Sequence, residues 1–184
     1  SGCRRRDRRR GQTLIEFTLV GIPLVFVLIS IFEMARGMWL YDTLAHAVRE
    51  GARYAMVHGH DCTVPPNSCI IQVRDIANRI NWAGLGLIPT ELQNVRMSTA
   101  TRPITCPTLN ACMTAGDPGD IYFPALPVGW AGYPDVGSQQ GAWVEVSAEY
   151  PFRSAIAMFW PGAGPGIIFP TFVLPASSRE RIQY

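Results

Sequence analysis

The sequence predicts an α+β protein with a long N-terminal transmembrane helix that extends into a small extracytoplasmic domain containing an antiparallel sheet. Three patterns predict this fold: an uncharged apolar run after an arginine-rich start, a helical periodicity that continues beyond the run, and a clear alternation at 143–150. We therefore expect a basic cytoplasmic leader at residues 1–11, a transmembrane helix with its amphipathic extension at 12–57, and an extracytoplasmic α+β domain at 58–184.

The apolar run covers residues 14–32 and holds no charged residue after Glu16. Its length matches the roughly 20 residues that cross a bilayer, whereas the apolar core of a signal peptide spans only about 7–15 residues. The following Glu33-Met34-Ala35-Arg36 is a poor signal-peptide cleavage site. Because arginines are retained in the cytoplasm, we expect a single-pass membrane protein with its N-terminus in the cytoplasm and its C-terminal domain outside.

The charge is distributed unevenly along the 184 residues. Residues 1–11 carry six arginines and one aspartate, a net charge of +5, and the remainder carries ten arginines and thirteen acids, a net charge of −3. A mildly acidic external part argues against a nucleic-acid surface. We therefore expect no nucleic-acid partner.

Four of the five cysteines, Cys62, Cys69, Cys106 and Cys112, lie on the expected outer side, where disulfides persist. Three pairings are possible, and we favour the local one, Cys62 with Cys69 and Cys106 with Cys112, because each closes a short loop. The spacings are longer than those of zinc knuckles, so we expect no metal.

Helical periodicity continues after the apolar run and should end at Gly59. One face carries polar residues such as Asp42 and Arg49, and the opposite face should pack on the sheet. That apolar face consists of Gly37, Tyr41, Leu44, Val48, Ala52 and Ala55.

The rest of the chain predicts shorter elements. A second amphipathic helix is expected at 70–80, capped by Asn67 or Ser68, and strands are expected at 94–100 and 143–150. Residues 101–141 show little periodicity, the type of 155–160 is open, and 167–174 and 176–182 predict two closing strands.

Two motifs together resemble a known family. Glu16-Phe17 opens the membrane helix, and its extension ends in Arg49, Glu50, Gly51, Ala52 and Arg53, followed by Tyr54-Ala55. This combination closely resembles TadE-like proteins, which are pilin-like minor components of tight-adherence (Tad or Flp) pilus systems. The resemblance covers roughly residues 10–57, with a weaker likeness at 146–153.

The resemblance implies processing and assembly roles at the start of the helix. Prepilins of this kind are cut by prepilin peptidase after a glycine and carry glutamate at the fifth mature position, which identifies Gly11 and Gln12 as the processing site and Glu16 and Phe17 as assembly residues. A carboxylate within a membrane costs about 2.5–3.5 kcal/mol on insertion scales, so a neighbouring amine would favour association. The alternative is a solvated Glu16 at the headgroup boundary, beside the arginines at 8–10.

The function that the resemblance implies is that of a minor pilin or pseudopilin in the assembly of a Tad-type (type IVc) pilus for adhesion or secretion. The resemblance places the protein in the bacterial inner membrane and, after assembly, in an extracellular pilus. Its partners would be the membrane, other pilins, Tad assembly proteins and prepilin peptidase. The alternative is an uncleaved, membrane-anchored adhesin or binding module. The sequence holds no nucleophile–base motif, phosphate loop or dinucleotide fingerprint, so we expect no enzyme, no cofactor and no small-molecule substrate.

Overall fold

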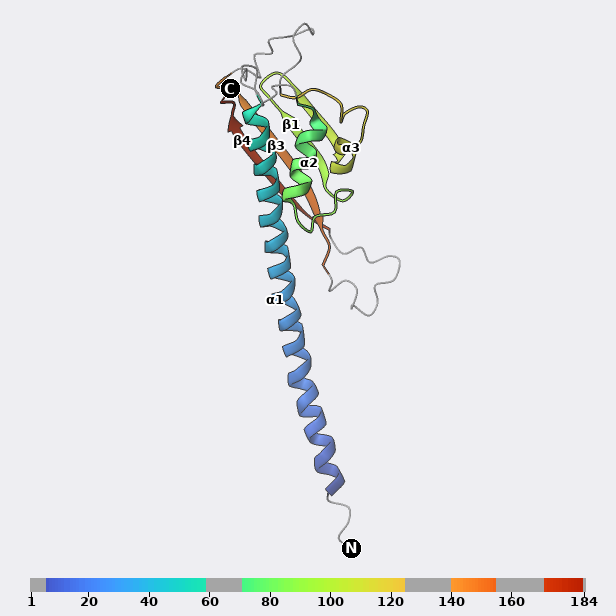
Figure 1. Cartoon of the computed structure of the whole chain (residues 1–184). Helices are drawn as coiled ribbons and strands as arrows, with labels where there is room; N and C mark the ends of the chain where they lie inside the picture. The colour runs from blue at the N-terminus through green and yellow to red at the C-terminus, as the bar shows by residue number, and fades with distance from the viewer. Residues whose placement is uncertain (1–5, 59–70, 125–139, 155–170, 184) are drawn as a thin grey trace. The chain divides into compact units, whose positions relative to one another are not determined.

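The computed structural model describes residues 6–58, 71–124, 140–154 and 171–183. Cys62, Cys69 and the segment 155–160 lie outside these ranges. The chain divides into two compact units: α1 up to Met38 belongs to the first, and the described elements from Trp39 onward form the second, which we call the domain. In chain order the elements are α1 (Arg6–Val57), α2 (Val73–Ala83), β1 (Gln93–Ser98), β2 (Pro103–Thr108), α3 (Leu109–Met113), β3 (Trp143–Phe152) and β4 (Phe172–Arg181) (Figure 1).

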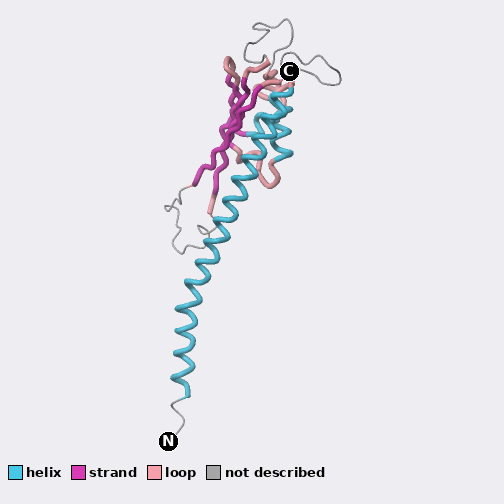
Figure 2. The backbone as a smooth tube through the Cα atoms, turned by 90° about the vertical axis from the view of Figure 1, so that its left-hand side faces the viewer, coloured by secondary structure: helices cyan, strands magenta, loops and turns pink. Residues whose placement is uncertain are grey.

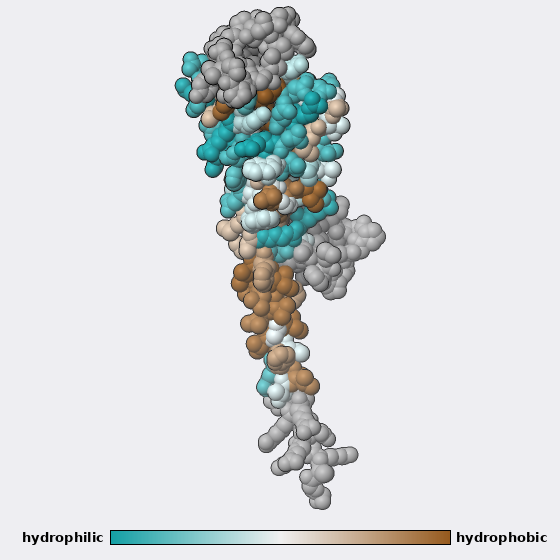
Figure 3. Space-filling model, in the orientation of Figure 1, coloured by the Kyte–Doolittle hydropathy of each residue, from teal (hydrophilic) through white to brown (hydrophobic). Residues whose placement is uncertain are grey.

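The first part of α1 has the composition of a membrane span. In the described part of the chain, one helix is long enough and apolar enough to cross a bilayer. It covers Thr13–Val57 and contains Pro23. Hydrophobic colouring gathers over this part of α1 in Figure 3. The Thr18 hydroxyl donates to the carbonyl of Leu14 at 3.1 Å, so even this polar group is satisfied within the helix. These properties indicate membrane anchoring.

The later part of α1 buries the predicted apolar face in the core of the domain. Leu44, Val48, Ala52 and Ala55 are fully buried, which confirms the helical periodicity. Tyr41 differs from the expectation: its side chain stays 47% exposed and lines a surface hollow together with residues of β3 and β4. The phenol hydroxyl explains why this residue remains near solvent at the margin of the core.

A four-stranded sheet in the order β2-β1-β3-β4, antiparallel throughout, forms the second layer of the domain. Figure 2 shows this sheet beside the helical layer. On β3 the alternation predicted from the sequence is confirmed, because every second side chain is buried: Val144, Val146, Ala148 and Tyr150. The α+β fold class is therefore confirmed.

Three local expectations were wrong. The segment 101–141 holds β2 and α3, and one strand, β4, replaces the two closing strands expected at 167–174 and 176–182. Proline explains both errors: Pro103 and Pro107 lie in β2 and Pro175 lies in β4, and a proline is tolerated in an edge strand, where its missing N–H is not needed. The N-cap of α2 is Gln72, whose backbone N–H donates to Asp75, and not Asn67 or Ser68.

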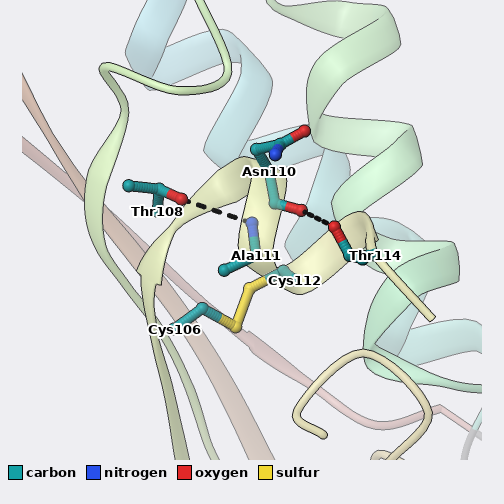
Figure 4. Close-up of a disulfide and its surroundings, with 6 residues drawn as sticks. All are labelled: Cys106, Thr108, Asn110, Ala111, Cys112 and Thr114. Atoms are coloured by element: carbon teal, nitrogen blue, oxygen red, sulfur yellow. Dashed lines mark hydrogen bonds between the residues drawn. A yellow bond between two sulfur atoms is a disulfide. The ribbon is translucent and has the colours of Figure 1, made fainter. Parts of the chain in front are cut away.

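A disulfide joins Cys106 of β2 to Cys112 of α3, as expected (Figure 4). The Thr108 hydroxyl caps α3 by accepting from the N–H of Ala111 at 3.3 Å, and the Thr114 hydroxyl donates to the Asn110 carbonyl at 2.7 Å. Both cysteines are almost fully buried. The disulfide therefore holds the short helix α3 on the edge strand β2.

We predict that the double variant Cys106→Ala/Cys112→Ala lowers the free energy of unfolding by about 2 kcal/mol, because a crosslink closing so short a loop removes a limited amount of chain entropy. Urea unfolding of the full chain in detergent, followed by circular dichroism, measures the change. Cys3→Ala is the matched control and should leave the midpoint unchanged. An unaltered midpoint in the double variant would show that this disulfide does not stabilise the domain.

Candidate assembly site on the N-terminal helix

The residues predicted to act in processing and assembly lie within one turn or two of each other on α1. Gly11 and Gln12 belong to the helix backbone, and Glu16 follows one turn after Gln12. The side chains of Glu16 and Phe17 are exposed on the helix surface, Phe17 by 75%. Glu16 is the only charged residue between positions 13 and 32, so it would be the one carboxylate within the apolar span.

An apolar surface hollow lies directly after Glu16 on the same helix. The described residues that line it come from one stretch of α1: Phe17, Thr18, Val20, Gly21, Ile22, Leu24, Val25 and Phe26. At Gly21 the space that a Cβ would occupy is open, since the nearest side-chain atom is Phe17 Cε1 at 4.0 Å. A small residue beside such a hollow permits close approach of another helix in a membrane.

The Arg49–Arg53 motif has a different environment, because its glycine packs against another helix of the same chain. A Cβ added at Gly51 would lie 2.5 Å from Ile80 Cγ1 of α2, a distance that real Cβ atoms essentially never show. Ile80 is itself buried, so it has little room to move. Glycine at this position therefore allows α1 and α2 to approach closely.

Charged residues of the motif flank this contact. Glu50 pairs with Arg53 at 3.3 Å within α1 and with Arg79 of α2 at 3.8 Å. Both arginines are substantially exposed, so each pair contributes little to stability. Of the two pairs, the one with Arg79 joins α1 to α2. Arg49 is exposed and Ala52 is buried in the core. We call the contact of Gly51 and Glu50 with Arg79 and Ile80 the α1–α2 seam.

Tyr54 and His58 follow the motif and contact each other at the end of α1. Burial, followed by the nearby Asp75 carboxylate, raises the pKa of Tyr54. The rings of Tyr54 and His58 lie 4.5 Å apart, and His58 Nδ1 is 2.7 Å from the Tyr54 carbonyl oxygen. In the ranges that the structure describes, no three His, Cys, Asp or Glu side chains come together as a metal site would require.

Sequence reasoning placed the motif on α1 but did not identify its partner. Arg79 and Ile80 of α2 contact the motif, although they lie almost thirty residues further along the chain. The only signal in the sequence was a glycine in the middle of a helix, where it is unfavourable by about 1 kcal/mol unless close packing requires it.

Comparison with known proteins supports the resemblance found in the sequence. A family model described as TadE-like protein matches residues 11–53, which include the predicted processing site, the apolar span and the Arg49–Arg53 motif. The predicted likeness to TadE-like proteins is thereby confirmed over this segment. No curated protein and no solved structure matches the chain.

We predict that Gly51→Ala destabilises the domain by about 1–2 kcal/mol, because overpacking against Ile80 exceeds the gain in helix propensity. Gly21→Ala, the same change in the same helix at an open position, is the control and should leave urea unfolding of the domain unaffected. Adding Ile80→Ala, which removes the clashing atoms, should make the double variant more stable than the sum of the two single changes. If the stability changes of the two single variants simply added in the double variant, the close contact of Gly51 with Ile80 would be contradicted.

Proposed function

We propose that this protein is a minor pilin or pseudopilin that takes part in assembly of a Tad-type (type IVc) pilus used in adhesion or secretion. The observation that carries the proposal is the TadE-like match over residues 11–53, which holds Gly11, Glu16 and the Arg49–Arg53 motif in one helix. Membrane anchoring by that helix supplies the setting.

In this proposal prepilin peptidase cleaves between Gly11 and Gln12. Cleavage removes the six arginines of the leader and creates an α-amine on Gln12, a cation at the start of the apolar span. Glu16 then becomes the fifth residue of the mature chain. A carboxylate at that depth favours association with a neighbouring amine, because a membrane strongly disfavours isolated charge.

Lateral packing would follow from the surface around Gly21. Among the described residues the hollow beside it is lined mainly by apolar side chains, and the nearest described side-chain atom to the place of a Cβ at Gly21 is 4.0 Å away. In lipid, such packing relies on close van der Waals contact because the hydrophobic effect does not distinguish a helix neighbour from an acyl chain. Glu16 would set the register of the neighbour, and the hollow would receive its side chains.

The runner-up function is an uncleaved, membrane-anchored adhesin or binding module that remains outside the filament. It shares the apolar helix and the domain, but it requires neither cleavage after Gly11 nor a role for Glu16. The two functions are therefore separated by the state of the N-terminus and by the effect of removing one carboxylate.

We predict that the mature chain begins at Gln12 in cells that contain prepilin peptidase and retains its arginine-rich leader in cells that lack it. Intact-mass spectrometry of the purified protein from both strains measures this directly. Gly11→Glu should retain the leader in both strains. An intact leader in the peptidase-containing strain would reject the cleaved pilin and favour the anchored module.

We further predict that Glu16→Ala reduces incorporation into sheared pili by tenfold or more, while the amount of protein in the membrane stays the same. Glu33→Ala is the matched control, since Glu33 lies beyond the apolar run and pairs with Arg36 at 3.6 Å. Immunoblots of the sheared and membrane fractions compare the variants. Equal incorporation of both would show that Glu16 has no role in assembly.

A further inference from the structure

Exposed apolar side chains of the domain gather at one of its ends. Six of them form what we call the entry-end patch, because it surrounds the point where α1 enters the domain: Trp39, Trp82, Leu85, Ile88, Phe172 and Val173. Leu85 is 75% exposed and Trp82 is 69% exposed. In the described part of the domain the one other large hydrophobic side chain of comparable exposure is Tyr41, which neighbours the same end. So uneven a distribution indicates a binding surface, since single exposed apolar residues are normally scattered.

Contacts between α1 and α2 bring the first four members together. Gly51 lies against Ile80, Ala47 lies against Gly84, and Trp39 lies against Gly86, so α2 runs antiparallel to α1. The end of α2 and the turn that follows it therefore reach the beginning of the domain's part of α1. Gly86 has φ +88° and a Cβ there would lie 2.6 Å from the Trp39 ring, so the turn fits tightly beside that ring.

The last two members reach the same end through β4. The N–H of Gln183 donates to the carbonyl of Met56, which places the end of β4 beside the end of α1. Tyr41, fifteen residues earlier on α1, shares a hollow with Pro175 and Ala176. Because β4 thus runs in the same direction as α1, its first residues, Phe172 and Val173, lie toward Trp39.

The position of Trp39 in the sequence identifies the environment of the patch. Trp39 follows the end of the apolar run by seven residues of continuous helix, a rise of about 10 Å. Helical side chains tilt toward the N-terminus, which brings the indole closer to the bilayer than its Cα. Trp residues are enriched at this depth, where the ring meets the headgroups. The Arg79 guanidinium lies 4.8 Å from the Trp82 ring and adds a cation suited to lipid phosphate.

We propose that the entry-end patch binds the headgroup interface of the bilayer that α1 crosses, and so holds the domain on the membrane surface before assembly. The tether identifies the occupant, because a surface attached about two helical turns beyond a membrane span meets lipid at very high effective concentration. Burial of the six side chains favours the docked domain, whereas leaving the membrane would expose them again. The inference requires the membrane span but not the pilus function, so either can fail without the other.

Tryptophan quenching tests the proposal with the full chain reconstituted in phosphatidylcholine–phosphatidylglycerol vesicles. Lipids brominated near the headgroup should quench the wild-type fluorescence, and Trp82→Phe should remove at least a quarter of the quenched signal. Trp143→Phe is the control, because Trp143 pairs with Arg181 at the opposite end of the sheet and should lie beyond reach of bromine. Equal loss of quenched signal in the two variants would overturn the proposal.

A second measurement separates lipid from a protein occupant. A benzophenone amino acid in place of Leu85 should, on irradiation of membranes from producing cells, give a chain whose mass increases by one phospholipid. The same group at the exposed Arg96, on the open face of the sheet, should give no lipid adduct. A crosslinked dimer or an adduct with another protein at position 85, in place of the lipid adduct, would reject lipid as the occupant.

Discussion

The close approach of Gly51 to Ile80 is the constraint on which the arrangement of the domain depends. With the contacts of Ala47 with Gly84 and of Trp39 with Gly86, it places α2 antiparallel to α1. The buried side chains of α2 then join the core of the domain: Val73, Ile76, Ala77 and Ile80. A Cβ at position 51 would force the two helices apart and open the core around it. Two residues of the Arg49–Arg53 motif are thus explained within a single chain: Gly51 allows the close contact, and Glu50 pairs with Arg79 of α2.

Helix α1 therefore lies in two environments, lipid and protein, and its residue composition changes where the environment changes. From Leu14 to Phe32 the side chains of α1 are mostly apolar and exposed, as a lipid solvent requires, and from Leu40 onward one face is buried by protein. The proposed assembly residues lie in the first part and the seam lies in the second. Changes in Glu16 and in Gly51 should consequently affect different properties, association in the first case and domain stability in the second.

Strong periodicity explains what could be predicted from the sequence. The buried face of α1, the face of α2 and the alternation of β3 were all predictable, because each is long enough to repeat its pattern several times. Strand β2 was missed since prolines interrupt a short edge strand, and β4 was split in two at Pro175. For the site, Glu16 stood out as a carboxylate in an apolar run, whereas the partners of Gly51 depend on tertiary packing that no local pattern encodes.

The proposed assembly depends on the pairing of Glu16 of one subunit with the Gln12 amine of another. A membrane-permeant carbodiimide joins a carboxylate and an amine only when they touch, and pili assembled from mixed ¹⁴N- and ¹⁵N-labelled chains distinguish bonds between subunits from bonds within one. The account predicts mixed-isotope peptides in which Glu16 is joined by an amide to the mature N-terminus of Gln12. Crosslinked peptides of one isotope only, or a chain that still carries its leader in the filament, would contradict it.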